Sequence, residues 1–239
     1  MVVKILCPRI PQAWLPCRRM SETFLPDEHA CAEGARYALL RRLAPALRHE
    51  SVAHLQPIAM AASVLERRLR DPAPDLAQVH DTATRLASYS RTAVQACLDL
   101  LEWLTPVPGR GVSLQAAVRG TLDLLRASLS LRGFTLRDEL RGTEALVRHA
   151  GLRYVLPACL LWLTDSAGSP AEVTLRADDA GPQLRLVMDL QPALGDAALA
   201  DPPAYRPLRA QEVAALARDE GIALARQGDT LSLTLDRSA

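Results

Sequence analysis

His49 and its neighbours are the residues of this chain best suited to carry chemistry. His49 lies in a run with helical periodicity but outside the apolar positions of that run, and a carboxylate, Glu50, follows it directly. An imidazole is largely neutral near about pH 7, and its free nitrogen lone pair can accept a phosphoryl group and pass it on. The sequence therefore makes His49 a candidate phosphoryl acceptor, with Glu50 placed to orient the ring or take its proton.

The residues around His49 recur with the spacing of a long amphipathic helix. One stripe repeats at intervals of three, four and seven: Leu40, Leu43, Leu47, His54, Ile58, Ala61 and Leu65. At 100° per residue this stripe fills a ~60° arc, and His49 projects about 150° from its centre. We expect His49 to face solvent and His54 to pack or hydrogen-bond within a helical bundle. Pro45 and Pro57 predict kinks or a break in the helix.

A second helix is expected from about Asp75 to Leu104, after a proline-rich turn at 71–75. Its apolar stripe contains Leu76, Val79, Ala83, Leu86, Ser90, Ala93, Val94, Cys97, Leu101 and Leu104. Two antiparallel helices cannot hide both stripes from water, and pairing with a second hairpin as a four-helix bundle removes this exposure. We therefore predict a homodimer.

The remainder of the chain alternates between helical and strand patterns. Helices are expected over 112–131, 152–163 and 211–219, and strands over 134–140, 172–177, 183–190, 222–225 and 230–235. This order predicts an α+β sandwich, with helices on one face of a mixed sheet. The predicted domains are an irregular arm over 1–31, a helical hairpin over 32–105 and the sandwich over 110–239.

Composition argues against several classes of function. The net charge is +1 and arginines alternate with acids, which indicates no nucleic-acid partner. The five cysteines form no CxxC pair and no zinc-site spacing, so we expect reduced thiols, no metal site and a cytoplasmic location. No apolar stretch approaches the ~20 residues of a membrane span, so no membrane association is expected.

The order of elements over residues 33–239 resembles the core of sensor histidine kinases, a dimerising helical hairpin followed by an ATP-binding α/β sandwich. The spacing from His49 and Glu50 to Leu55 and Gln56 is most similar to the phosphoacceptor box of the sporulation phosphotransferases. This chain departs from that type at Ala53, where the family carries asparagine. The resemblance implies that His49 is the phosphoacceptor.

The predicted sandwich departs from the kinases at the positions that hold nucleotide. Where kinases carry two asparagines, one of them a magnesium ligand, this chain has Ala158 and Trp162, and neither offers the oxygen that a hard cation needs. Asp189 matches the adenine-reading aspartate of the kinases, but the glycines that follow it there are missing. We therefore expect no nucleotide and no cofactor.

A hairpin with an acceptor histidine and a nucleotide-free sandwich resembles the histidine phosphotransferases of bacterial phosphorelays. The resemblance implies response-regulator receiver domains as partners, which would supply the magnesium. Arg48 would offset the charge of the incoming phosphate, and Gln56 and Met60, in phase with His49, would line the contact surface. Two alternatives stay open, a divergent histidine kinase that still binds ATP and a non-catalytic module that sequesters receivers.

Overall fold

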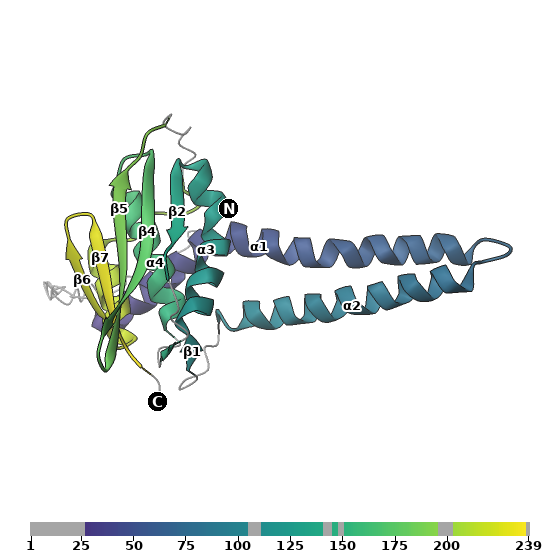
Figure 1. Cartoon of the computed structure of the whole chain (residues 1–239), viewed down its shortest axis with the longest axis horizontal. Coiled ribbons are helices and arrows are strands. Elements are labelled where there is room, and N and C mark those ends of the chain that lie inside the picture. Colours follow the sequence, from purple (N-terminus) through teal and green to yellow (C-terminus); the bar gives the residue numbers. More distant parts are fainter. Residues whose placement is uncertain (1–26, 105–110, 141–144, 148–150, 196–202, 238–239) are drawn as a thin grey trace, which may run out of the picture.

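A long helical hairpin projects from an α/β domain (Figure 1). The structure, a computed structural model, describes residues 27–104, 111–140, 145–147, 151–195 and 203–237. The hairpin consists of α1 (Glu28–Leu69) and α2 (Leu76–Leu101), which pack against each other. Helix α2 begins after Asp75, whose carboxylate accepts hydrogen bonds from the first free backbone N–H groups of the helix.

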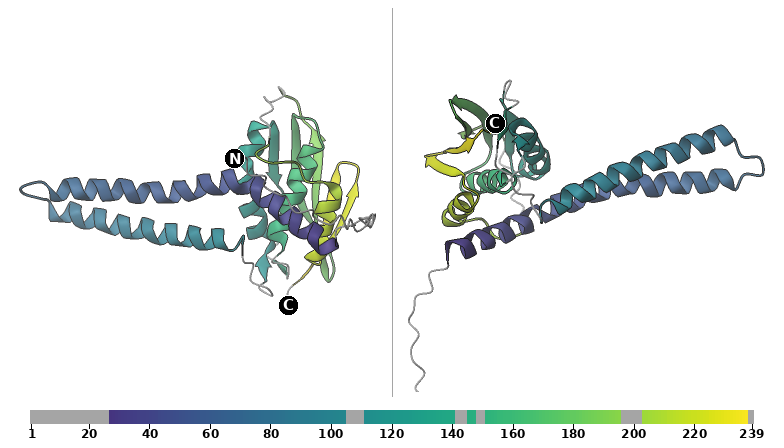
Figure 2. Two further views of the ribbon diagram at one scale, coloured as in Figure 1. Left: turned by 180° about the vertical axis from the view of Figure 1, so that it is seen from behind. Right: turned by 90° about the horizontal axis from the view of Figure 1, so that it is seen from below.

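The α/β domain is a five-stranded mixed sheet with helices on one face (Figures 1 and 2). Its elements are β1 (Val112–Ser113), α3 (Leu114–Leu131), β2 (Phe134–Asp138), β3 (Leu146–Val147), α4 (Leu152–Asp165), β4 (Ala171–Ala180), β5 (Gln183–Pro192), α5 (Ala210–Asp219), β6 (Ala223–Gln227) and β7 (Thr230–Asp236). The sheet order is β2-β4-β5-β7-β6, in which only β2 and β4 run parallel. This architecture confirms the predicted α+β class.

The sheet buries alternate side chains against the helices. On β5, Leu186, Met188 and Leu190 are buried in the main core, whereas Arg185 is exposed and Asp189 is half-buried. Because side chains of a strand alternate between faces, Asp189 lies on the sheet face that the helices do not cover. The strands predicted over 172–177 and 183–190 are present and pair as an antiparallel hairpin, β4–β5.

The first turns of α1 pack on the α/β domain rather than on α2. Small and apolar side chains of this segment are fully buried: Ala32, Ala35, Ala38, Leu39 and Leu43. They lie mainly against α5, and four of them share one core cluster with the sheet. Arg42 forms a buried ion pair with Asp165 at the end of α4, and Arg36 forms ion pairs with Asp219 and Glu220 at the end of α5. Helix α1 therefore joins the hairpin firmly to the sandwich.

Helix α1 is longer and more continuous than predicted. It begins at Glu28, inside the predicted arm of residues 1–31, and residues 1–26 of that arm lie outside the described residues. The predicted break is wrong, since α1 runs through both Pro45 and Pro57. Figure 2 shows α1 changing direction where it leaves the α/β domain, so the helix is kinked rather than broken.

The contact between α1 and α5 contains one histidine whose charge depends on pH near neutrality. His29 Nδ1 lies 3.0 Å from Asp219 Oδ1, and this hydrogen bond raises the pKa of His29 above 6.5 and lowers that of Asp219 below 3.8. The contribution of His29 to stability is therefore complete below pH 6.5 and is lost as pH rises through its folded-state pKa. The Asp219 contribution is lost only when pH falls through its own folded-state pKa.

The variant His29→Gln should consequently lose the pH dependence that this contact produces. Denaturant unfolding across a pH series should show the free energy of unfolding of the wild type declining above pH 6.5, relative to the variant. The contact is exposed and screened by solvent, so the difference should be small. Parallel curves for the two proteins would contradict a role for this histidine in fastening α1.

Of the helices that the structure describes, none combines the length and apolar character that crossing a membrane requires.

Candidate functional site

His49 lies on an exposed face of α1, about midway along the helix. No hydrogen bond or ion pair joins its ring to another of the described residues. The faces of α1 follow the predicted phase, since Leu43 is buried and Leu47 and Ile58 are half-buried. The imidazole is therefore open to a partner protein from the side of α1 that points away from α2.

The other predicted site residues surround His49 on three sides of the helix. Because α1 is continuous, Gln56 and Met60 lie on the same face as His49 at intervals of two and three turns, and both are exposed. Arg48 is also exposed but projects about 100° from His49. Glu50 projects about 100° in the opposite direction and forms no hydrogen bond with the ring among the described residues. The structure thus groups His49 with Gln56 and Met60 rather than with Glu50.

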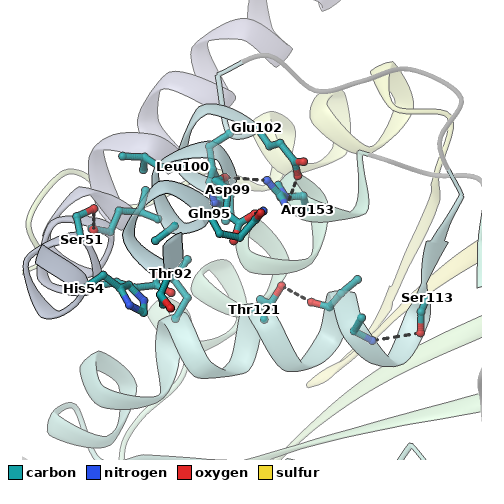
Figure 3. Close-up of a pocket in the computed structure, with 18 residues that line it drawn as sticks. Ser51, His54, Thr92, Gln95, Asp99, Leu100, Glu102, Ser113, Thr121 and Arg153 are labelled. Carbon is teal, nitrogen blue, oxygen red and sulfur yellow. Dashed lines mark hydrogen bonds and ion pairs between the residues drawn. The ribbon is translucent and has the colours of Figure 1, made fainter. Parts of the chain in front are cut away.

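Glu50 and His54 instead line a cavity between the hairpin and the α/β domain (Figure 3). The cavity has a volume of about 690 Å³, and its walls come from α1, α2, α3 and the start of α4. His54 is half-buried there, on the α1 stripe where the sequence places it. His49 is not among the lining residues. The cavity and the exposed imidazole therefore occupy different sides of the same part of α1.

The positions that match the nucleotide ligands of kinases hold packing residues in this domain. Ala158 is fully buried, and Trp162 packs against the core with the guanidinium carbon of Arg226 4.6 Å from its ring centre. Neither side chain supplies an oxygen ligand. Over the described ranges, no group of three or more His, Cys, Asp and Glu residues is arranged to hold a metal ion.

Both carboxylate oxygens of Asp189 accept hydrogen bonds from residues of the sheet. One carboxylate oxygen accepts from the Thr230 hydroxyl at 2.6 Å, and the other accepts from the Gln191 amide at 2.9 Å. These hydrogen bonds, that from Thr230 first, lower the pKa of Asp189. Asp189 also lies on the sheet face that the helices do not cover.

Sequence reasoning missed the cavity, because its walls combine residues far apart along the chain. Thr92 and Asp99 of α2 line it together with Glu50 of α1 and Arg153 of α4, so the lining comes from elements far apart in the sequence. The glycine at position 120, inside an otherwise regular helix, was a local signal for open space in this region.

Comparisons with known proteins find structural likeness only. No family model matches the chain, and no curated protein matches it. A histidine kinase from Burkholderia phymatum is 18% identical, with 83% of this chain and 99% of that chain covered at a TM-score of 0.42. The histidine kinase ThkA in complex with response regulator protein TrrA is 14% identical, covering 89% and 65% of the two chains at 0.42. A bacterial phosphotransferase is 16% identical, covering 83% and 95% at 0.35. Similarity of this degree does not establish a shared family or activity.

Proposed function

We propose that the protein is a histidine phosphotransferase that relays a phosphoryl group between response-regulator receiver domains through His49. The observation that carries the proposal is an imidazole exposed on a helical hairpin, beside an α/β domain whose nucleotide positions hold packing residues. Gln56 and Met60 extend the exposed face on which a receiver would dock. Arg48, on the adjoining side, would offset phosphate charge.

The chemistry requires only a free nitrogen lone pair and an in-line approach. The lone pair of one imidazole nitrogen attacks the phosphorus of a receiver's aspartyl phosphate, a P–N bond forms, and the P–O bond to the aspartate breaks. The aspartate leaves as a carboxylate, and the proton on the second imidazole nitrogen passes to water, because Glu50 forms no hydrogen bond with the ring among the described residues. Magnesium held by the receiver would neutralise the transferred charge. Transfer onward reverses these steps.

The attachment of α1 favours transfer over the alternative of a divergent kinase. A kinase must bring the nucleotide in its sandwich up to the acceptor histidine. Here the buried Arg42–Asp165 pair and the Arg36 contacts hold the sandwich against α1. The sandwich also faces the Glu50 and His54 side of α1 rather than the His49 face. An external donor meets none of these restrictions.

The test is incubation with a receiver domain that carries labelled aspartyl phosphate. We expect label to appear on this protein in an acid-labile, alkali-stable form, as a phosphohistidine should. Incubation with labelled ATP and magnesium alone should leave the protein unlabelled. Labelling by ATP would support the kinase alternative, and binding of receivers without any acquisition of label would support a sequestering module.

The proposed homodimer is supported by a second apolar surface on the hairpin. Along α2 the exposed or half-buried row Ala83, Ala87, Ser90, Val94, Cys97 and Leu101 repeats at alternating intervals of four and three. Val79, Thr82 and Leu86 occupy the neighbouring face toward α1. The predicted single stripe of α2 therefore divides into one row that contacts α1 and one that faces solvent.

A matching exposed row on α1 makes the surface broad enough for a bundle. Val52, Leu55 and Ala59 are exposed, with Val52 and Leu55 each about half accessible. In two antiparallel helices at 100° per residue, this row and the α2 row lie on the same side of the hairpin, opposite α3. Two hairpins that pack these rows together would form a four-helix bundle, with Arg48, one turn before Val52 on the same face of α1, at the end of the seam.

The substitution Val94→Asp should dissociate this proposed dimer. Two-fold symmetry would place two carboxylates in the apolar seam, each without a partner, at a cost of several kcal/mol in total. Sedimentation at micromolar concentration should show a dimer for the wild type and a monomer for Val94→Asp. The matched control is Ser88→Asp, an exposed position on another face of α2, which should remain dimeric. A monomeric wild type would disprove the dimer, but it would not contradict the proposal that His49 is the phosphoryl acceptor.

A further inference from the structure

The cavity between the hairpin and α3 has the size and walls of a small-molecule site. Its volume of about 690 Å³ is within the range of roughly 300–1,000 Å³ that such sites occupy. Leu47, Leu100, Trp103 and Leu124 supply apolar surface. Polar side chains from α1, α2 and α3 line the same space, among them Ser51, Thr92 and Thr121 (Figure 3).

Hydroxyl groups on three walls can only accept hydrogen bonds from a ligand. Ser51 on α1, Thr92 on α2 and Thr121 on α3 each donate their proton to the carbonyl oxygen four residues earlier in the helix. The donor–acceptor distances are 2.8, 3.2 and 2.9 Å. With the proton used in this way, only the oxygen lone pairs remain.

The charges of the walls add to this excess of acceptors. Glu50 on α1 and Asp99 on α2 both line the cavity, and neither forms an ion pair with another described residue. The Gln95 amide nitrogen donates to Asp99 at 2.9 Å, so the amide oxygen of Gln95 is left as a further acceptor. Two exposed carboxylates without an ion-pair partner among the described residues and several neutral acceptors therefore line one space.

Most of the donors of the cavity are already engaged. Arg153 binds the Glu102 carboxylate at 2.8 Å and the backbone carbonyl of Asp99 at 3.2 Å, and it lies over the Trp103 ring. Ser113 retains its hydroxyl proton, and the His54 ring donates or accepts according to its tautomer. A ligand that fits this lining must itself supply N–H donors and positive charge.

Gly120 opens the α3 wall of the cavity. A Cβ atom added at this residue would meet nothing within 4 Å. Glycine destabilises a helix interior relative to alanine, and α3 requires no unusual backbone conformation at this position. The absence of a side chain leaves the helix backbone accessible to whatever occupies the cavity.

We propose that this cavity binds a small organic cation with two nitrogen groups separated by a short carbon chain. Its ammonium or guanidinium groups would donate to Glu50, Asp99 and the hydroxyl oxygens, and its chain would lie on the apolar surface beside Trp103. The site is separate from the phosphotransfer role, because His49 does not line the cavity. It would bind its ligand whether or not His49 accepts phosphate.

Calorimetric titration of the full chain with agmatine and with 1,4-diaminobutane tests the proposal. Both cations should bind, and butane-1,4-diol, which has the same chain without charge, should not. The variant Asp99→Asn should weaken cation binding by about tenfold or more, because it removes one charge-assisted hydrogen bond. Asp81→Asn, which removes an exposed carboxylate elsewhere on α2, should leave the affinity unchanged.

A pair of substitutions at Gly120 separates filling of the cavity from changes in helix stability. Gly120→Ala and Gly120→Leu both favour the helix, but only leucine extends well into the cavity. Binding should persist in the alanine variant and disappear in the leucine variant, with equal helix content by circular dichroism. Equal binding of the diol, or cation binding indifferent to Asp99→Asn and Gly120→Leu, would overturn the proposal. The proposal would also fail if neither diamine bound. If Gly120→Leu then weakened the docking of a receiver, the cavity would be assigned to a cationic side chain of that partner protein.

Discussion

Replacing His49 with glutamine should abolish labelling of this protein by a phosphorylated receiver domain. Glutamine keeps a polar side chain of similar length at an exposed helical position, so the fold and the proposed dimer should persist. Its amide nitrogen has no available lone pair for attack on phosphorus, and the rate of transfer should fall by about a thousandfold or more. Quantifying label over time for both proteins at equal receiver concentration provides the measurement.

The matched control is His54→Gln, five residues along the same helix. His54 faces the cavity beside Ser51 and is half-buried, so a receiver docked over the His49 face would not reach it. This variant should retain transfer within about twofold of the wild type. Label that survives His49→Gln and disappears in His54→Gln would move the acceptor to the cavity and contradict the proposed function.

Glu50→Gln measures how much the neighbouring acid contributes. A base that removes a proton in the transition state commonly contributes about 10²–10⁴ in rate. The Glu50 carboxylate lines the cavity and does not hydrogen-bond the His49 ring. The loss should therefore stay below about tenfold. A larger loss would mean that Glu50 turns toward the imidazole when the receiver binds.

The exposure of His49 could be predicted because it depends only on helical periodicity. The regular 100° step fixed the phase of Leu43, Leu47 and Ile58, and the same step placed His49 on the opposite side. The β4–β5 hairpin was predictable for a similar reason, since strand alternation and the turn at Gly181 are properties of contiguous residues. The exposure of His49 and the hairpin both depend on the pattern of residues that are close together in the sequence.

Contacts between distant segments could not be read from the same patterns. Ala32, Ala35 and Ala38 have the spacing of a helix face, but their small side chains give little apolar signal. Their partners on α5 lie more than 170 residues later in the chain, which no local pattern records. Periodicity predicts a single apolar stripe on α2, because it identifies apolar positions without indicating which neighbouring helix each position contacts.

The buried ion pair between α1 and α4 should account for a large part of the attachment of the hairpin. Asp165 is 7% exposed and Arg42 is 3% exposed, and Arg132 also donates to Asp165 at 2.8 Å. Asp165→Ala would leave the buried guanidinium of Arg42 without a counter-charge. We expect the free energy of unfolding to fall by about 3–5 kcal/mol, measured by denaturant titration.

The double variant Arg42→Leu with Asp165→Leu distinguishes loss of the pair from exposure of an unpaired charge. An apolar pair of similar volume restores burial without desolvating any ion, so the double variant should recover most of the stability lost in Asp165→Ala. Proteolysis of α1 should follow the same order, fastest in the single variant, because α1 detaches when Arg42 must return to water. If both variants were equally unstable, the geometry of the ion pair itself would be required. If neither were destabilised, the alanine and leucine side chains of α1 alone would suffice to hold the hairpin on the sandwich.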